Sequence, residues 1–195
     1  MAATANIPPQ CSTALKEWAT VLDAMARGEQ IVLIRKGGLI EPGSGFELSA
    51  EHVVFYPTFE HQAVNYLRPE FRRYFEEASA RRAPDGQVRF ELAGVAAGSW
   101  RSSDPGIIER LSRFHVYNDA FATQRLKWQP DQPLLIAAIR AYRLPEPCTI
   151  AVAPQYAGCK SWVELESPVA CAGARPVLDD ASFAARLKDL HSVLG

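Results

Sequence analysis

The sequence has little cysteine, no excess of charge of one sign and no long hydrophobic run. Its four cysteines, in 195 residues, are never closer than eleven positions, so no C-x-x-C pair predicts a zinc or redox site, and free thiols are expected. Lys and Arg number 21 against 22 Asp and Glu, which excludes a strongly basic arm and an acidic tail. The longest apolar run, Leu134 to Ile139, is far shorter than the roughly 18 residues of a membrane helix. These absences predict a protein without a metal site and without a membrane span.

The first ten residues contain neither a basic residue nor an apolar stretch, so they lack both parts of a secretory signal. We therefore expect residues 1–11 to form a flexible leader and the protein to be cytoplasmic. Residues 12–168 are expected to form a single domain. Residues 169–195 are expected to form a small-residue linker and an amphipathic C-terminal helix over 180–194.

Apolar periodicity predicts a mixed order of helices and strands. Leu15, Trp18, Leu22 and Met25 recur at helical steps and predict a helix over residues 12–27. Further helices are predicted at 69–78, 105–114 and 119–127, and strands at 31–34, 53–56, 88–95, 134–144, 148–152 and 162–165, with prolines ending several of the strands. This order lacks a regular βαβ alternation. It favours an α+β fold with a small curved mixed or antiparallel sheet and flanking helices.

Signatures of nucleotide chemistry are missing from the sequence. The glycines at 37, 38, 43 and 45 fit neither the P-loop nor the G-x-G-x-x-G spacing. No acidic residue is followed by the Glu/Gln-x-Lys pair of a metal-dependent nuclease. The sequence therefore predicts no cofactor, and it does not decide whether the protein is an enzyme.

Two polar pairs are candidates for catalysis. Glu60 and His61 follow a predicted strand, where they could serve as base or ligand at a pocket mouth; a capping glutamate and a backbone-bonded histidine are the structural alternative. Lys160 and Ser161 are the residue types of a Ser-Lys dyad. Successive residues on a strand point to opposite faces, so a binding loop or a plain strand entry is the alternative for this pair.

Aromatic and basic side chains could instead bind nucleic acid. Trp18, Tyr56 and Trp162 are available to stack a base, although aromatic residues more often belong to the core. Residues 64–160 carry 14 basic and 10 acidic side chains, a net charge of +4. This locally basic middle is compatible with nucleic-acid binding.

Several words in the sequence carry a resemblance to a known family. They are ALKEW at 14–18, GEQ at 28–30, IRKGG at 34–38, YPTFEHQ at 56–62, FH at 114–115, RLKW at 125–128 and YAGCKSWVEL at 156–165. In this order they resemble a bacterial family of unknown function, the one numbered eighteen-oh-two, over residues 14–166, with the final helix outside. That family is reported near Mrr-type restriction endonuclease domains. The resemblance therefore implies a place in restriction-modification and a restriction endonuclease component as partner.

A second, shorter pattern is similar to the PUA-like group that includes ASCH and EVE domains. It consists of Trp18 on a predicted helix, Gly28-Glu29 at the end of that helix and a strand that ends at Arg35. The sequence departs from that group at Gln30, where lysine is common. This resemblance implies a PUA-like β-barrel that binds a base in a pocket.

The leading hypothesis is a non-catalytic module that associates with DNA or RNA and reads modified or flipped bases. Trp18, Tyr56 and Trp162 would stack a base, and Glu60 with His61 would read its polar edges. The residues expected to meet phosphates are Arg35, Lys36, Arg143 and Lys160. A first alternative is a hydrolase or nuclease-like enzyme that uses Glu60, His61, Lys160 and Ser161. A second is a protein-interaction module with an exposed apolar patch on the final helix.

Overall fold

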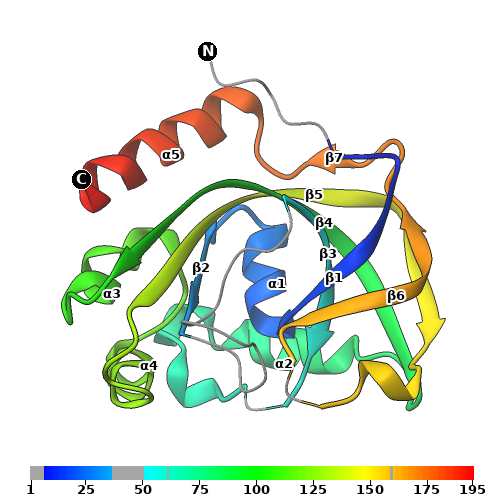
Figure 1. Ribbon diagram of the computed structural model, residues 1–195, viewed down its shortest axis with the longest axis horizontal. Coiled ribbons are helices and arrows are strands. Elements are labelled where there is room, and N and C mark those ends of the chain that lie inside the picture. Colours follow the sequence, from blue (N-terminus) through cyan, green and yellow to red (C-terminus); the bar gives the residue numbers. More distant parts are fainter. Residues whose placement is uncertain (1–6, 37–50, 61, 159) are drawn as a thin grey trace.

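The computed structural model describes residues 7–36, 51–60, 62–158 and 160–195. Within these residues, seven β-strands form one mixed sheet, accompanied by five α-helices and four short 3₁₀ turns. The sheet curls around helix α1 (Ala19–Ala26), which lies inside the curve (Figure 1). The predicted α+β fold with a small curved sheet is therefore confirmed.

The strands follow one another across the sheet in the order β2-β5-β4-β3-β1-β6, with β7 on β5. Their bounds are β1 Gln10–Trp18, β2 Val32–Arg35, β3 His52–Thr58, β4 Gln87–Ser102, β5 Leu134–Ala151, β6 Trp162–Ala170 and β7 Arg175–Pro176. β1 and β3 run parallel, with Lys16 opposite Tyr56, and the other pairs are antiparallel. β1 therefore lies between β3 and β6 as an interior strand.

The predicted helix over residues 12–27 is wrong in its first half. Residues 10–18 form β1, and only Ala19–Ala26 are helical. Ala14 and Leu15 are successive residues and both are fully buried, because the two faces of β1 pack against two different apolar clusters. Hydrogen bonds to a strand on each side outweigh the helical spacing of the apolar residues.

Several strands also run through prolines that were expected to end them. β3 includes Pro57, where it pairs with β1 only, because its pairing with β4 ends at Val54. β5 joins two predicted strands across Pro145 and Pro147, which lie in a register shift where residues 144–147 oppose a single residue of β4. Pro57 faces no paired residue on its β4 side, and Pro145 and Pro147 lie outside the paired register of β4 and β5, so a missing N–H is tolerated and both strands continue.

The helices lie around the sheet. α2 (Arg73–Ala80) packs against α1, while α3 (Ile107–Arg110) and α4 (Asp119–Lys127) follow β4. α5 (Asp180–Leu194) has the bounds predicted from the sequence and lies across the outer side of β5 (Figure 1). The 3₁₀ turns are Val64–Tyr66, Pro69–Phe71, Ser112–Phe114 and Pro154–Tyr156. None of the helices in the described residues is long and apolar enough to cross a membrane.

Candidate functional site

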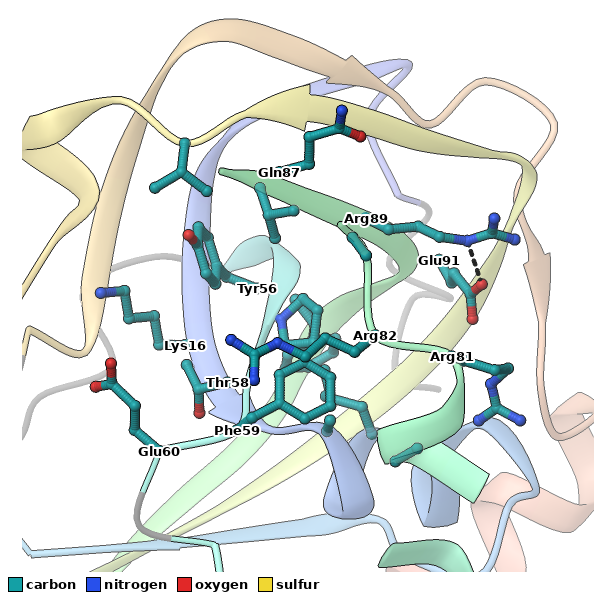
Figure 2. A pocket seen from close by; sticks show the side chains of 18 of the residues that line it. Lys16, Tyr56, Thr58, Phe59, Glu60, Arg81, Arg82, Gln87, Arg89 and Glu91 are labelled. Carbon is teal, nitrogen blue, oxygen red and sulfur yellow. Dashed lines mark hydrogen bonds and ion pairs between the residues drawn. The ribbon is translucent and has the colours of Figure 1, made fainter. Parts of the chain in front are cut away.

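A pocket of about 460 Å³ opens beside α1, on the face of the sheet formed by the ends of β1 and β3 and the start of β4 (Figure 2). It is also lined by residues 81–86, which connect α2 to β4, and by residues 156–158. Five basic and four acidic residues line it, together with Tyr56, Phe59 and Tyr156. The pocket thus combines aromatic rings with charges of both signs.

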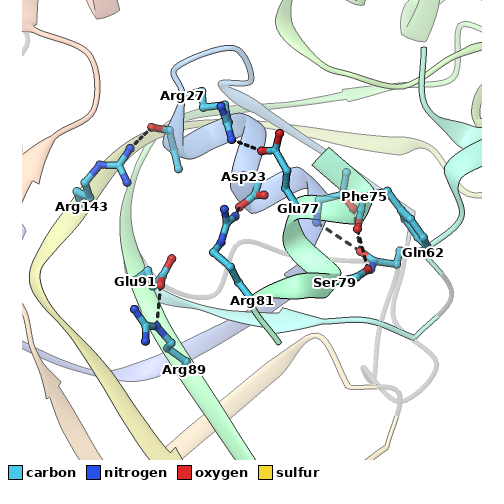
Figure 3. Close-up of polar contacts among 12 residues, drawn as sticks. Asp23, Arg27, Gln62, Phe75, Glu77, Ser79, Arg81, Arg89, Glu91 and Arg143 are labelled. Carbon is cyan, nitrogen blue, oxygen red and sulfur yellow. Dashed lines mark hydrogen bonds and ion pairs between the residues drawn. The ribbon is translucent and has the colours of Figure 1, made fainter. Parts of the chain in front are cut away.

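One wall of the pocket depends on ion pairs that hold α2 against α1. Arg81 pairs with Asp23, and Arg27 pairs with Glu77 (Figure 3). Burial raises the pKa of the Asp23 carboxyl, and Arg81 opposes that rise. Asp23 Oδ2 is buried without a hydrogen-bond partner. The Asp23–Arg81 pair therefore fixes the segment that closes this side of the pocket.

The opposite wall contains Tyr56 and Lys16, which are neighbours across β3 and β1. The Lys16 ammonium lies 5.4 Å from the centre of the Tyr56 ring and donates to the carbonyls of Tyr156 at 2.5 Å and Gly158 at 2.9 Å. Tyr56 is 8% exposed, and burial raises the pKa of its phenol. Its ring meets Phe90 edge-on with 5.8 Å between ring centres. These contacts hold the Tyr56 ring in one orientation.

Arginines surround the mouth of the pocket. The Arg82 guanidinium lies over the Phe59 ring, 5.2 Å from its centre (Figure 2). Its ion pair with the exposed Asp85 carboxylate is long, at 4.0 Å. Arg89 pairs with Glu91 at 2.7 Å, whereas Arg143 donates to the carbonyl of Ala26 at 2.5 Å (Figure 3). Among the described residues, therefore, no strong ion pair occupies the donors of Arg82 and Arg143.

Three of the predicted site residues line this pocket: Tyr56, Glu60 and Arg143. Lys160 and Ser161 border it without lining it. The Lys160 ammonium donates to the carbonyl of Gln155 at 2.7 Å, and the carbonyl of Ser161 accepts from the backbone of Lys16 at 2.8 Å. His61 lies outside the described residues.

The other predicted residues lie elsewhere. Trp162 is half-buried and packs against the larger apolar cluster. Trp18 packs against the same cluster, stacked on Tyr66 with ring centres 6.2 Å apart. Arg35 and Lys36, at the end of β2, lie near Arg125 of α4, and we call Arg35, Lys36 and Arg125 the cation cluster.

Sequence reasoning missed the pocket residues Asp23, Phe59, Arg81 and Arg82. Arg81 and Arg82 stand just before the Asp85-Gly86 turn. A basic segment next to a turn was therefore the one sequence feature that could have indicated these pocket residues. The helix predicted over residues 69–78 ends before these arginines, so the sequence did not connect them with a pocket. They reach the pocket because α2 packs against α1 and brings its last residues over the sheet.

The structure bears on the two alternative functions as well. No hydrogen bond or ion pair joins Glu60 to Lys160 or Ser161 among the described residues. Within the same residues, no group of three or more His, Cys, Asp or Glu side chains could hold a metal ion. Among the described residues, α5 shows no exposed apolar patch, because its Phe183 and Leu190 are buried in the larger apolar cluster.

Three crystal structures, all of ASCH from Zymomonas mobilis, are similar to this chain. One single-substitution mutant has 12% sequence identity and a TM-score of 0.44, covering 94% of this chain and 99% of that one. The structure described simply as ASCH has 10% identity and a TM-score of 0.43, covering 91% and 94%. Another mutant has 9% identity and a TM-score of 0.42, covering 91% and 96%. No curated protein matches the chain.

A family model matches residues 14–189 and is described as a domain of unknown function, DUF1802. The match corrects the expectation that the final helix lies outside the family, since it includes most of α5. It covers residues 14–18 of β1, the pocket and the cation cluster. The chain therefore belongs to the DUF1802 family.

Proposed function

We propose that the pocket binds a single base of a nucleic acid and that the protein is a non-catalytic module that reads flipped or modified bases. The observation that carries this proposal is the lining of the 460 Å³ pocket, where aromatic rings stand beside paired charges. Its volume is in the range of sites for small organic molecules. A nucleobase has a flat face to stack and an edge with both donors and acceptors, which matches such a lining.

The stacking surface would be provided by Tyr56 and by the Arg82–Phe59 pair. A guanidinium that lies over an aromatic ring offers a second flat face for a base. Glu60 and Gln87 line the same pocket and supply an acceptor and an amide for the base edge. Modified bases would be distinguished by how their added groups fit between these side chains.

The phosphates next to the bound base would meet Arg82 and Arg143 at the mouth. Both arginines line the pocket, and neither forms a strong ion pair within the part of the chain that the structure describes. Contacts of this kind release counterions from nucleic acid, so they predict that affinity falls as salt rises.

The proposal is tested by fluorescence anisotropy with labelled single-stranded and duplex oligonucleotides, modified and unmodified, across a salt series. We expect salt-sensitive binding, weakened about tenfold by Arg82→Gln or Arg143→Gln, each of which removes one charged contact. Arg110→Gln is the matched control, because Arg110 is an exposed arginine paired with Asp104 away from the pocket. Binding that ignores salt, or no binding at low salt, would contradict the proposal.

The same samples distinguish a reader from a nuclease-like enzyme. After incubation, a reader leaves the labelled oligonucleotide intact on a denaturing gel, whereas cleavage that scales with protein concentration would favour the enzyme.

We also propose that the protein acts in the cytoplasm beside a restriction endonuclease component. If the protein is purified from cells under native conditions, a restriction endonuclease component should purify with it. Purification of the protein without such a component would count against the association.

A further inference from the structure

The cation cluster lies where β2, α4 and the end of β1 meet, and one of its members is neutralised. Arg35 forms an ion pair with Glu17 at 3.0 Å and also donates to the backbone carbonyl of Lys16. Glu17 is 7% exposed, so this pair is largely withdrawn from water. The Glu17 carboxylate is therefore already committed to Arg35.

Lys36 is a buried cation that forms no ion pair with a carboxylate among the described residues. It is 2% exposed, and its ammonium donates to the backbone carbonyl of Leu126 at 3.0 Å. Burial lowers the pKa of Lys36, Arg125 lowers it further, and Asp131 acts weakly in the other direction. One carbonyl satisfies only one of the three donors of an ammonium group.

Arg125 carries a half-buried guanidinium. Its Nε is buried with no partner, and no hydrogen bond or ion pair links its side chain to any described residue. Its close contact is the Phe121 ring, 5.0 Å from the guanidinium carbon to the ring centre. Burial lowers the pKa of Arg125 and the positive charge of Arg35 adds to that effect, while Tyr117 and Glu17 act in the other direction.

Among the described residues, the cluster thus has three cations and one ion-paired carboxylate, Glu17, with Asp131 as a further neighbour of Lys36, so positive charge is in excess in a poorly solvated place. Charges buried without a partner are costly, and a bound anion would remove that cost. A guanidinium fork beside an ammonium matches the oxygens of a phosphate group, which accept several hydrogen bonds at once.

We propose that Lys36 and Arg125, supported by the Arg35–Glu17 pair, bind a phosphate group at a site separate from the pocket. Lys16 and Glu17 are successive residues of β1 and point to opposite faces, so the pocket and this site lie on different sides of the strand. Neither Lys36 nor Arg125 lines the pocket. The proposal therefore stands independently of the proposed base-binding function.

The test compares inorganic phosphate with chloride and acetate at equal ionic strength, measured as the shift in Tm. At about tenfold excess over the dissociation constant, bound phosphate should raise Tm by roughly 3–5 °C beyond the effect of chloride. Arg125→Gln should abolish this phosphate-specific shift. Lys127→Gln is the matched control, since Lys127 is exposed on the same helix, and it should keep the full shift.

A second measurement keeps the test valid if Arg125→Gln fails to fold. The ³¹P resonance of inorganic phosphate should broaden when wild-type protein is added, and Lys127→Gln should leave that broadening unchanged. Displacement of phosphate by a short oligonucleotide would place the phosphate on a nucleic-acid backbone, whereas displacement only by a nucleoside monophosphate would indicate a free small ligand. The proposal is overturned if chloride or acetate works as well as phosphate, or if folded Arg125→Gln keeps the shift.

Discussion

Individual polar residues in the interior are held by specific hydrogen bonds. His115 is 2% exposed; its Nε2 lies 2.8 Å from the carbonyl of Ile108, and its Nδ1 accepts from the backbone of Tyr117 at 3.1 Å. These partners require a neutral imidazole with the proton on Nε2. Burial accordingly lowers the pKa of His115 to about 4.

The first prediction concerns stability in mild acid. The pKa of His115 falls from 6.5 in the unfolded chain to about 4 in the fold. The contribution of the neutral imidazole to the unfolding free energy is therefore complete above pH 6.5 and is lost as the pH falls from there through 4. We expect a loss of about 3 kcal/mol of unfolding free energy from this residue. Urea unfolding of wild type and His115→Gln measures it. The difference between the two proteins should shrink between pH 6.5 and 4, and a constant difference would contradict the assignment.

The second prediction concerns a glycine that the sheet requires to be small. A Cβ on Gly94 would lie 2.7 Å from Phe55 and 2.8 Å from Ile139, both buried in the core. We expect Gly94→Ala to lower the unfolding free energy by about 1–3 kcal/mol, since overpacked cores shift their neighbours. Gly106→Ala is the control, because its Cβ would meet mainly the end of the flexible Arg110 side chain. Equal urea midpoints for the two variants would refute this argument.

At the scale of elements, some segments were predictable and others were not. α4 and α5 agree with their predicted bounds, because capping residues precede them: Asn118 accepts from Phe121 at 3.2 Å, and Asp179 accepts from Ser182 at 2.7 Å. The prediction of a helix over residues 12–27 was wrong for residues 12–18, because these residues pair with β3 on one side and β6 on the other. The local sequence carries no information about these two partner strands.

The third prediction tests the cap of α4, the helix that carries Arg125. Asn118 Oδ1 accepts from Ala120 at 3.0 Å and from Phe121, while its amide donates to the carbonyls of Asn65 and Leu67. Asn118→Ala should cost about 1–2 kcal/mol, measured by urea unfolding. Asn118→Asp keeps the capping oxygen and loses the two donations, so its cost should be smaller. A larger cost for the aspartate would show that the cap is not the main contribution.

At the scale of the whole molecule, the pocket exists because distant segments are fastened together. The Asp23–Arg81 and Arg27–Glu77 pairs join α1 to α2, and Arg143 of β5 reaches the end of α1 (Figure 3). These contacts span tens of residues in the sequence. Composition and periodicity therefore identified only part of the pocket, namely Tyr56, Glu60 and Arg143.

The fourth prediction concerns α5, which packs on the domain as part of its core. Leu190 is fully buried, and Arg186 donates to the backbone carbonyls of Gly28, Glu29 and Arg113. Leu190→Ala should cost about 2–5 kcal/mol and lower Tm by roughly 5–15 °C, measured by calorimetry. Lys188→Ala, on the exposed side of the same helix, should leave Tm nearly unchanged. A small loss for Leu190→Ala would mean that α5 is a loosely attached appendage.

By itself, the sequence determined the α+β class, most of the helices and the absence of a P-loop or C-x-x-C motif, because periodicity, capping and spacing are local properties. It did not determine that residues 10–18 form a strand, or that the pocket and the cation cluster lie on opposite sides of β1. Those outcomes depend on which strands pair and which helices pack, and contacts between residues far apart in the chain decide them. Only the tertiary structure shows that Arg81 and Arg82 close a pocket, and that Lys36 and Arg125 lie together without an ion pair to any carboxylate of the described residues.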